Sequence, residues 1–121
     1  MGNHAADPTA RFFAELAGRE HEPLLRKASG STRFDIVDGR KTRRWLVTVD
    51  RGNIAVSSGG GEADCVMRAD EAVFARIASG RLNAVAAVLR GDLQVEGDWR
   101  LLVLMQRLFP GRRSSRRSAT A

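Results

Sequence analysis

The order of hydrophobic periods along this 121-residue chain constrains its fold more than any other feature. Between Gly30 and Ala69 apolar residues alternate with polar ones, which is the period of β-strands. From Asp70 onward apolar residues recur at helical spacing, interrupted by one further alternating segment around Leu93–Val95. Strands followed by helices, with one strand inserted late, predict an α+β domain whose sheet is covered on one face by helices.

Turn residues divide the alternating region into four expected strands. These are Thr32–Ile36, Arg44–Asp50, Ile54–Ser57 and Asp64–Ala69. Asp38-Gly39 and Arg51-Gly52 favour tight hairpin turns, and Gly59–Gly61 is a flexible break before the fourth strand. Because the links are short, we predict an antiparallel meander. With Leu93–Val95 added, the expected sheet is five-stranded and largely antiparallel.

Four helical segments are expected around this sheet. They are Pro8–Lys27, interrupted near Gly18 or Pro23, then a helix that starts after Asp70 and is stopped by Gly80, then Ala84–Arg90 and Trp99–Phe109. The residues that precede them are good N-caps: Asp7, Asp70, Asn83 and Asp98. The last helix has an apolar arc of roughly 160°, whereas a helix that rests on a sheet needs a little over 100°. This surplus is compatible with a lined cavity and equally with a packed core, because both require apolar residues that face inward.

Several short motifs follow one another in the second half of the chain. They are Ala63-Asp64, Ser79-Gly80, Arg90-Gly91, the strand Leu93–Val95, and Gly97. In this order and spacing the chain resembles the sterol carrier protein type 2 family of lipid-binding domains, over about Thr9 to Gly111. The resemblance implies an α+β fold with a five-stranded sheet and a hydrophobic tunnel that takes sterols, fatty acids, acyl chains or other lipids. It implies no catalysis.

The resemblance also indicates where a ligand would lie, since the family's lining is defined by apolar character. By position, the expected lining residues are Phe74, Ile77, Val85, Val88, Leu89, Leu102, Met105 and Phe109, with Trp45 and Val47. We therefore expect a lipid or other apolar small molecule as the partner, held between the sheet and the C-terminal helices.

The residues that usually carry chemistry are sparse. Cys65 is the single cysteine and has apolar neighbours, which is typical of a buried structural thiol. His4 and His21 are the two histidines, and neither has the spacing of a catalytic triad or a zinc site. Gly59–Gly61 lacks the lysine of a phosphate-binding loop. We expect no enzyme activity, no metal and no cofactor.

The net charge of +6 is concentrated near one end of the chain. Four of the positive charges come from arginines close together in the last ten residues: Arg112, Arg113, Arg116 and Arg117. We expect residues 112–121 to form a disordered basic tail, residues 1–8 a flexible leader, and residues 9–111 the single domain. The alternative function is a small nucleic-acid- or protein-binding module that uses this tail, which would also contact an acidic membrane surface weakly.

Neither end of the sequence has the pattern of a targeting signal. The first residues do not read as a secretory signal, and the longest apolar run, Ala84–Leu89, is far shorter than the roughly 20 residues of a transmembrane helix. The last three residues, Ala119-Thr120-Ala121, differ from a peroxisomal signal of the serine-lysine-leucine type. A cytoplasmic location is expected.

Overall fold

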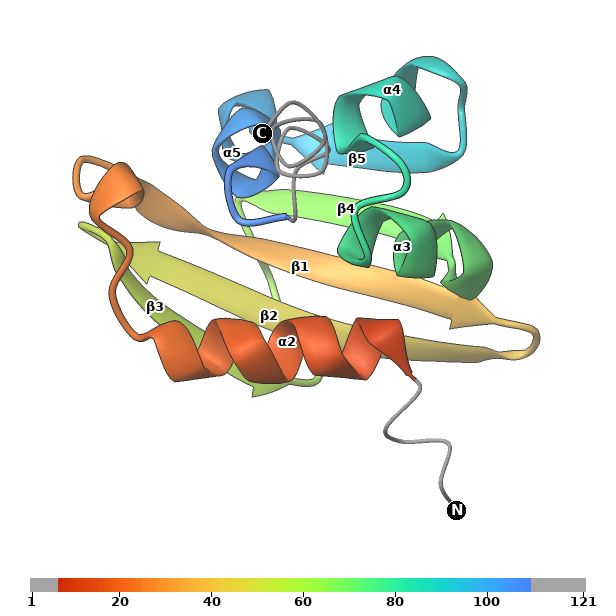
Figure 1. Ribbon diagram of the computed structural model, residues 1–121, viewed down its shortest axis with the longest axis horizontal. Coiled ribbons are helices and arrows are strands. Elements are labelled where there is room, and N and C mark those ends of the chain that lie inside the picture. Colours follow the sequence, from red (N-terminus) through yellow and green to blue (C-terminus); the bar gives the residue numbers. More distant parts are fainter. Residues whose placement is uncertain (1–6, 110–121) are drawn as a thin grey trace, which may run out of the picture.

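The structure, a computed structural model, describes residues 7–109. In chain order its elements are α2 (Pro8–Arg19), η1 (Pro23–Leu25), β1 (Ser29–Asp38), β2 (Lys41–Asp50), β3 (Asn53–Ser58), β4 (Cys65–Asp70), α3 (Glu71–Ala78), α4 (Ala84–Leu89), β5 (Leu93–Gly97) and α5 (Trp99–Gln106) (Figure 1). The predicted leader and basic tail lie almost wholly outside the described residues. Helix α2 begins at Pro8, inside the segment expected as leader. No helix within residues 7–109 is long and apolar enough to cross a membrane.

Helix starts follow the capping residues read from the sequence, with one exception. The Asp7 carboxylate accepts hydrogen bonds from the N–H groups of Thr9 and Ala10, at 3.1 and 3.2 Å. The side chains of Asn83 and Asp98 cap α4 and α5 in the same way. Asp70 occupies the N-cap position of α3, but its side chain makes no capping hydrogen bond. The break expected near Gly18 or Pro23 lies between α2 and η1, and α5 ends three residues before Phe109.

The five strands form one sheet in the order β3-β2-β1-β4-β5, which confirms the α+β fold with a largely antiparallel sheet. The pairs β1–β2, β2–β3 and β4–β5 are antiparallel. The predicted meander is wrong at β4, which pairs with β1 in parallel and places Cys65 opposite Thr32. The segment between β3 and β4 crosses to the far side of β1 instead of turning back as a hairpin (Figure 1).

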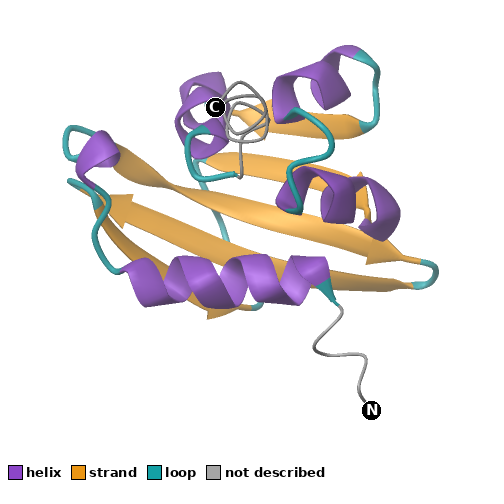
Figure 2. Cartoon of the chain, in the orientation of Figure 1, coloured by secondary structure: helices purple, strands orange, loops and turns teal. Residues whose placement is uncertain are grey.

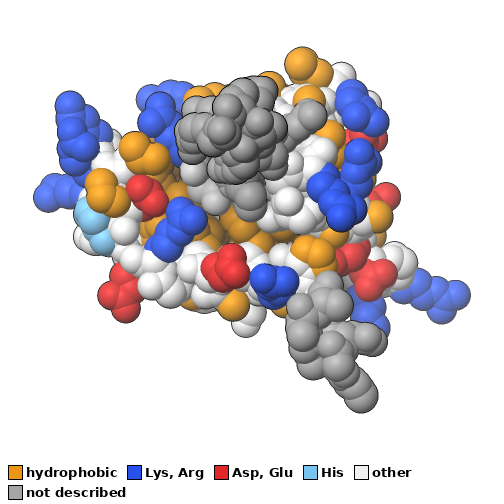
Figure 3. Space-filling model, in the orientation of Figure 1, with side chains coloured by type: hydrophobic (Ala, Val, Ile, Leu, Met, Phe, Trp, Pro, Cys, Tyr) orange, Lys and Arg blue, Asp and Glu red, His pale blue; other side chains and the backbone are white. Residues whose placement is uncertain are grey.

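The helices cover one face of this sheet (Figure 2). Phe34, Val47 and Met67 point toward the helices from β1, β2 and β4 and are buried, whereas Arg44 and Arg68 on the opposite face are exposed. Helix α2 packs on β3 and α3, while α5 packs on β1, β4 and β5. Figure 3 shows hydrophobic atoms between α2 and the helices above it. The core therefore lies in a single layer between sheet and helices.

Candidate ligand-binding site

Six of the ten predicted lining residues lie in the interior between sheet and helices. Their side chains are buried and belong to one apolar core: Val47, Phe74, Ile77, Leu102, Met105 and Phe109. The alternation in β2 and the helical spacing of α3 and α5 turn these side chains inward. They therefore have the orientation that the sequence predicts, and whether a ligand contacts them stays a prediction.

Aromatic rings from four parts of the chain occupy the middle of this interior. The ring of Phe13 stacks on that of Phe74, with centroids 5.6 Å apart, and Phe74 meets Phe109 edge to face at 5.9 Å. Phe12 stacks on Phe109 at 4.9 Å, and Phe34 lies against Phe13 at 5.2 Å. In this structure, side chains of the core itself fill the centre of the space predicted to hold a ligand.

The predicted inward orientation is wrong for Val85 and Leu89. Their side chains are 38% and 84% exposed, because α4 packs inward through the small side chains of Ala84 and Ala87. Every residue of this short helix is apolar, so the sequence contains no polar residue that marks its outer face. Val88 is half-buried and packs against the core.

Two grooves lie beside Trp45: one along β2 and the end of β3, the other between these strands and α2. The larger, of about 370 Å³, is lined by Thr42, Arg43, Arg44, Trp45, Ser58, Gly59 and Gly60. The smaller, of about 250 Å³, is lined by Ala10, Phe13, Ala14, Trp45, Val56, Ser57 and Ser58. Trp45 and Ser58 line both, so the two grooves are treated as two sections of one site. We call it the Trp45 groove.

Trp45 connects this groove to the aromatic interior. Its ring stacks on Phe13 of α2 with centroids 4.5 Å apart and planes nearly parallel, at 9°. Phe13 in turn stacks on Phe74, which is a predicted lining residue. A continuous row of ring contacts thus leads from the Trp45 groove to the core.

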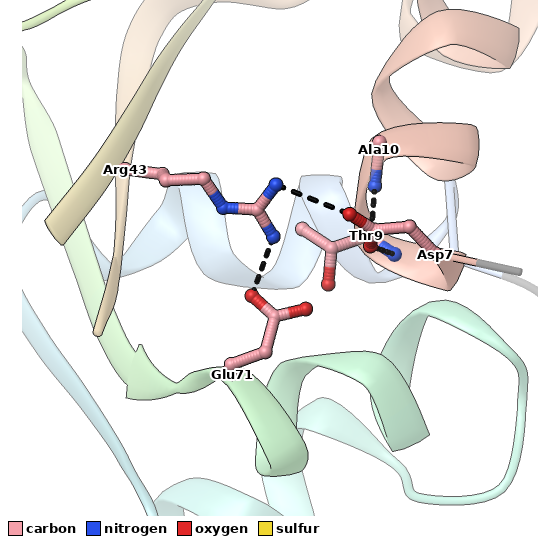
Figure 4. Close-up of polar contacts among 5 residues, drawn as sticks. All are labelled: Asp7, Thr9, Ala10, Arg43 and Glu71. Carbon is pink, nitrogen blue, oxygen red and sulfur yellow. Dashed lines mark hydrogen bonds and ion pairs between the residues drawn. The ribbon is translucent and has the colours of Figure 1, made fainter. Parts of the chain in front are cut away.

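An ion-paired arginine lies above this row of rings. The Arg43 guanidinium donates hydrogen bonds to the carboxylates of Asp7, at 3.1 Å, and Glu71, at 2.6 Å (Figure 4). It also lies 5.0 Å from the centre of the Trp45 ring, which is a cation–π distance. Arg43 therefore joins β2 to the first turns of α2 and α3. Together these contacts form the Arg43 cluster: Asp7, Arg43, Trp45 and Glu71.

Contacts within the Arg43 cluster shift the pKa of Asp7 and of Arg43. Burial raises the pKa of Asp7, but hydrogen bonds from Ala10 and Arg43 outweigh it, and the net pKa lies below the ordinary value of 3.8. For Arg43, burial lowers the pKa, but hydrogen bonds to Glu71 and Asp7 hold the net pKa above its ordinary range. Both groups are charged at neutral pH. The buried hydroxyl of Thr9 lies in the same region of Figure 4 and has no hydrogen-bond partner in the described part of the chain.

Sequence reasoning missed Arg43 and Phe13. The second strand was expected to begin at Arg44, whereas β2 begins at Lys41. Extending the alternation back from Trp45 and Val47 by two residues puts Arg43 on the inward face, opposite Ile36 of β1. A charged side chain at an inward position favours a nearby opposite charge, and Asp7, the N-cap of α2, supplies one. Phe13 was expected to lie in the first helix, but the sequence did not indicate which rings it contacts.

Within the described residues, neither the cysteine nor the histidine lines the Trp45 groove. Burial, with smaller effects from Asp98 and Asp64, raises the pKa of the Cys65 thiol to about 11, so it stays protonated at neutral pH. The Nδ1 atom of His21 is 2.9 Å from the side-chain oxygen of Asn53, at the far end of β3. Within residues 7–109, no three His, Cys, Asp or Glu side chains converge as a metal site would require.

Parts of two known proteins are similar to this chain in sequence. Hydroxysteroid dehydrogenase-like protein 2 of Danio rerio is 28% identical over 109 residues, which cover 87% of this chain and 26% of that protein. Sterol carrier protein 2 of Homo sapiens is 28% identical over 92 residues, which cover 74% of this chain and 17% of that protein. The chain thus spans no more than about a quarter of the length of these two relatives.

Solved structures show the same fold. The solution structure of sterol carrier protein 2 from Aedes aegypti in complex with palmitate superposes with a TM-score of 0.67. It is 22% identical, and the match covers 83% of this chain and 92% of that chain. Residues 11–110 of the present sequence match the SCP-2 sterol transfer family. Because that match covers most of the sequence and the fold agrees, the chain belongs to the SCP-2 sterol transfer family.

Proposed function

We propose that this chain binds one lipid-like molecule, such as a fatty acid, acyl chain or sterol, and releases it unchanged. The observation that carries this proposal is the Trp45 groove, whose tryptophan stacks on the Phe13 ring of the apolar core. Family membership supports it, as do two Aedes aegypti structures of the same fold whose proteins carry palmitate.

The ligand's apolar part would first lie along the smaller section of the Trp45 groove. Ala10, Ala14 and Val56 offer an apolar surface there, and their small side chains leave room for an alkyl chain. The larger section, at about 370 Å³, falls at the lower end of the range of roughly 300–1,000 Å³ found for small-molecule sites. Displacement of the Phe13 ring would then let the ligand's alkyl chain reach the predicted lining residues Phe74, Leu102, Met105 and Phe109.

We assign this chain the binding step alone. The Cys65 thiol is buried and protonated, and His21 lies away from the groove. The segment matched in hydroxysteroid dehydrogenase-like protein 2 is about a quarter of that protein, so the dehydrogenase likeness in its name would belong to the remaining length. The cytoplasmic location and the alternative use of residues 112–121 for nucleic acid or protein stay predictions.

Titration with a fluorescent fatty acid tests the proposal, with native mass spectrometry to count bound molecules. The full chain should take up one molecule saturably, and unlabelled palmitate should displace it. Trp45→Ala should weaken binding at least about tenfold, because a large aromatic contact is lost. Trp99→Ala is the matched control: it removes the other tryptophan, which is exposed on α5 far along the sequence from the groove, and should leave affinity unchanged.

Two results would overturn the proposal. The first is the absence of saturable uptake of both a fatty acid and a sterol by the folded full chain. The second is equal binding by Trp45→Ala and the unmodified chain, which would place the ligand away from the Trp45 groove. Circular dichroism of each variant would verify that the fold is retained.

A further inference from the structure

Large apolar side chains are exposed mainly on two neighbouring helices. Five such residues are exposed within residues 7–109, and four of them lie on α4 and α5. On α4 these are Val85 and Leu89, whose exposed fractions are given above. On α5 they are Trp99 and Val103, at 51% and 57%. The fifth, Leu24 on η1, is 59% exposed and lies near the N-terminal end of β1.

The spacing puts each pair on one side of its helix. Val85 and Leu89 are four residues apart, as are Trp99 and Val103, so the members of each pair are neighbours on the helix surface. Helices α4 and α5 contact each other and flank β5 (Figure 1). In Figure 3, hydrophobic atoms protrude at the top of the molecule over α4, with lysine and arginine atoms on either side. We call these four residues the α4–α5 face.

The charges beside the α4–α5 face are mainly positive. Neither helix contains an acidic residue, and three exposed arginines lie on or directly after them: Arg90, Arg100 and Arg107. Asp92 and Asp98 partly neutralise two of these, at 3.5 Å from Arg90 and 3.0 Å from Arg100. Arg107 has no acid partner in the described part of the chain, and the sequence beyond Phe109 adds four more arginines without an acid.

We propose that the α4–α5 face docks the protein on the surface of a membrane that contains anionic lipids. A membrane surface has a layer of lipid phosphates above a layer of acyl chains. The exposed apolar side chains can insert among the acyl chains, while the arginines beside them bind the phosphates. Trp99 suits the boundary between those layers, because its ring is apolar and its N–H needs a polar partner. This inference does not depend on the Trp45 groove, which lies on α2 and the outer strands.

Vesicle flotation of the full chain tests the docking. The protein should float with vesicles of phosphatidylcholine and phosphatidylglycerol, and much less with phosphatidylcholine alone. The double variant Leu89→Gln/Val103→Gln should lower the partition coefficient at least about tenfold, because two buried apolar contacts are lost. Leu24→Gln is the matched control, since it makes the same kind of change at an equally exposed site, and it should float like the unmodified chain.

The fluorescence of Trp99 on vesicles gives a second readout, because it reports contact with lipid and does not change when a substitution only lowers stability. In a Trp45→Phe background Trp99 is the remaining tryptophan. Its emission should shift to the blue on anionic vesicles and be quenched by lipids brominated on their acyl chains. Uptake of monomeric fatty acid by Leu89→Gln/Val103→Gln should be unchanged, which separates membrane docking from ligand binding.

Several results would overturn the docking proposal. One is equal flotation of Leu89→Gln/Val103→Gln and Leu24→Gln. Another is complete loss of flotation on deletion of residues 112–121 with no effect of the double variant, which would assign the contact to the tail. A third is a dimer of the unmodified chain in solution that the double variant abolishes, because the face would then be covered by a second copy.

Discussion

Arg43 links three elements through charged contacts. Its guanidinium pairs with Asp7 before α2 and with Glu71 in α3, while its stem belongs to β2 and its charge lies over Trp45. The two carboxylates are only partly exposed, so water screens these pairs less than it screens a fully exposed pair. The Arg43 cluster therefore couples the position of α2 to that of α3, beside the Trp45 ring that stacks on Phe13.

The substitution Asp7→Asn separates two roles of Asp7: its charge, which pairs with Arg43, and its capping of α2. Asparagine is also a good N-cap, so the substitution removes the ion pair with Arg43 and should cost about 1 kcal/mol of unfolding free energy at pH 7. Because the folded pKa of Asp7 lies below its ordinary 3.8, this stabilisation is present above about pH 4 and is lost as the pH falls further. Denaturant unfolding from pH 7 to pH 3 should show the two proteins converging.

Glu15→Gln is the control for this pH series. The Glu15 carboxylate pairs with Arg11 at 3.9 Å on the exposed side of α2, and such pairs contribute little. Its unfolding free energy should match that of the unmodified chain throughout. A constant difference between Asp7→Asn and the unmodified chain down to pH 3 would contradict the role given to the Asp7 charge.

Among the elements, local sequence signals predict the hairpins and the helices well. Asp38-Gly39 and Arg51-Gly52 lie at the observed turns, where Gly39 and Gly52 have a positive φ that glycine adopts without steric cost. The parallel pairing of β4 with β1 has no such local signal. It depends on the path of a flexible segment, and alternation within Cys65–Asp70 is the same for either strand direction.

The candidate site was predictable to the extent that polar residues mark the faces of its elements. Trp45 and Val47 alternate with Arg44 and Thr48, so their inward orientation follows from the sequence, as it does for Phe74 and Ile77. Val85 and Leu89 sit in a helix made only of alanine, valine and leucine, where the outer face is decided by which residues pack closely. Aromatic rings fill the interior because of distances between elements, and the hydrophobic periodicity of the sequence does not specify those distances.

Gly97 lets the end of β5 approach the backbone of Asp64 and Cys65 closely, and replacing it tests this role. Its φ of 97° is unfavourable for other residues, and a Cβ there would overlap the carbonyl oxygen of Asp64. Gly97→Ala should lower the unfolding free energy by about 3 kcal/mol, because strain and overlap add. Gly91→Ala, at a φ of 82° with open space around the Cβ, should cost only about 1 kcal/mol. Urea unfolding that shows equal losses would contradict this account.

At the scale of the whole molecule, ligand binding and core packing draw on the same space. The rings of Phe12, Phe13, Phe74 and Phe109 contact one another where a ligand is predicted to lie. Binding must therefore replace ring contacts with ligand contacts, and the net affinity is the difference between the two. The free energy of ligand binding and the free energy of unfolding should consequently respond together to changes in this core.

Phe13→Ala makes that link measurable. Without ligand the variant should lose about 3–5 kcal/mol of unfolding free energy, since a fully buried ring is removed. Saturating fatty acid should raise its melting temperature more than that of the unmodified chain, because no ring has to be displaced. Leu24→Ala, at an exposed site, should change neither quantity. A smaller ligand-induced rise in Phe13→Ala would show that the ring contributes to binding instead of blocking it.

The parallel pairing of β1 with β4 also has a consequence during synthesis. A chain made from its N-terminus can form β1, β2 and β3 into a small antiparallel sheet before Cys65–Asp70 leaves the ribosome. Throughout that interval the middle strand of the finished sheet has one open edge, with unpaired N–H and C=O groups along Thr32–Val37. Open edges of this kind attract other extended chains. The nascent protein is therefore most exposed to misassembly until its fourth strand emerges.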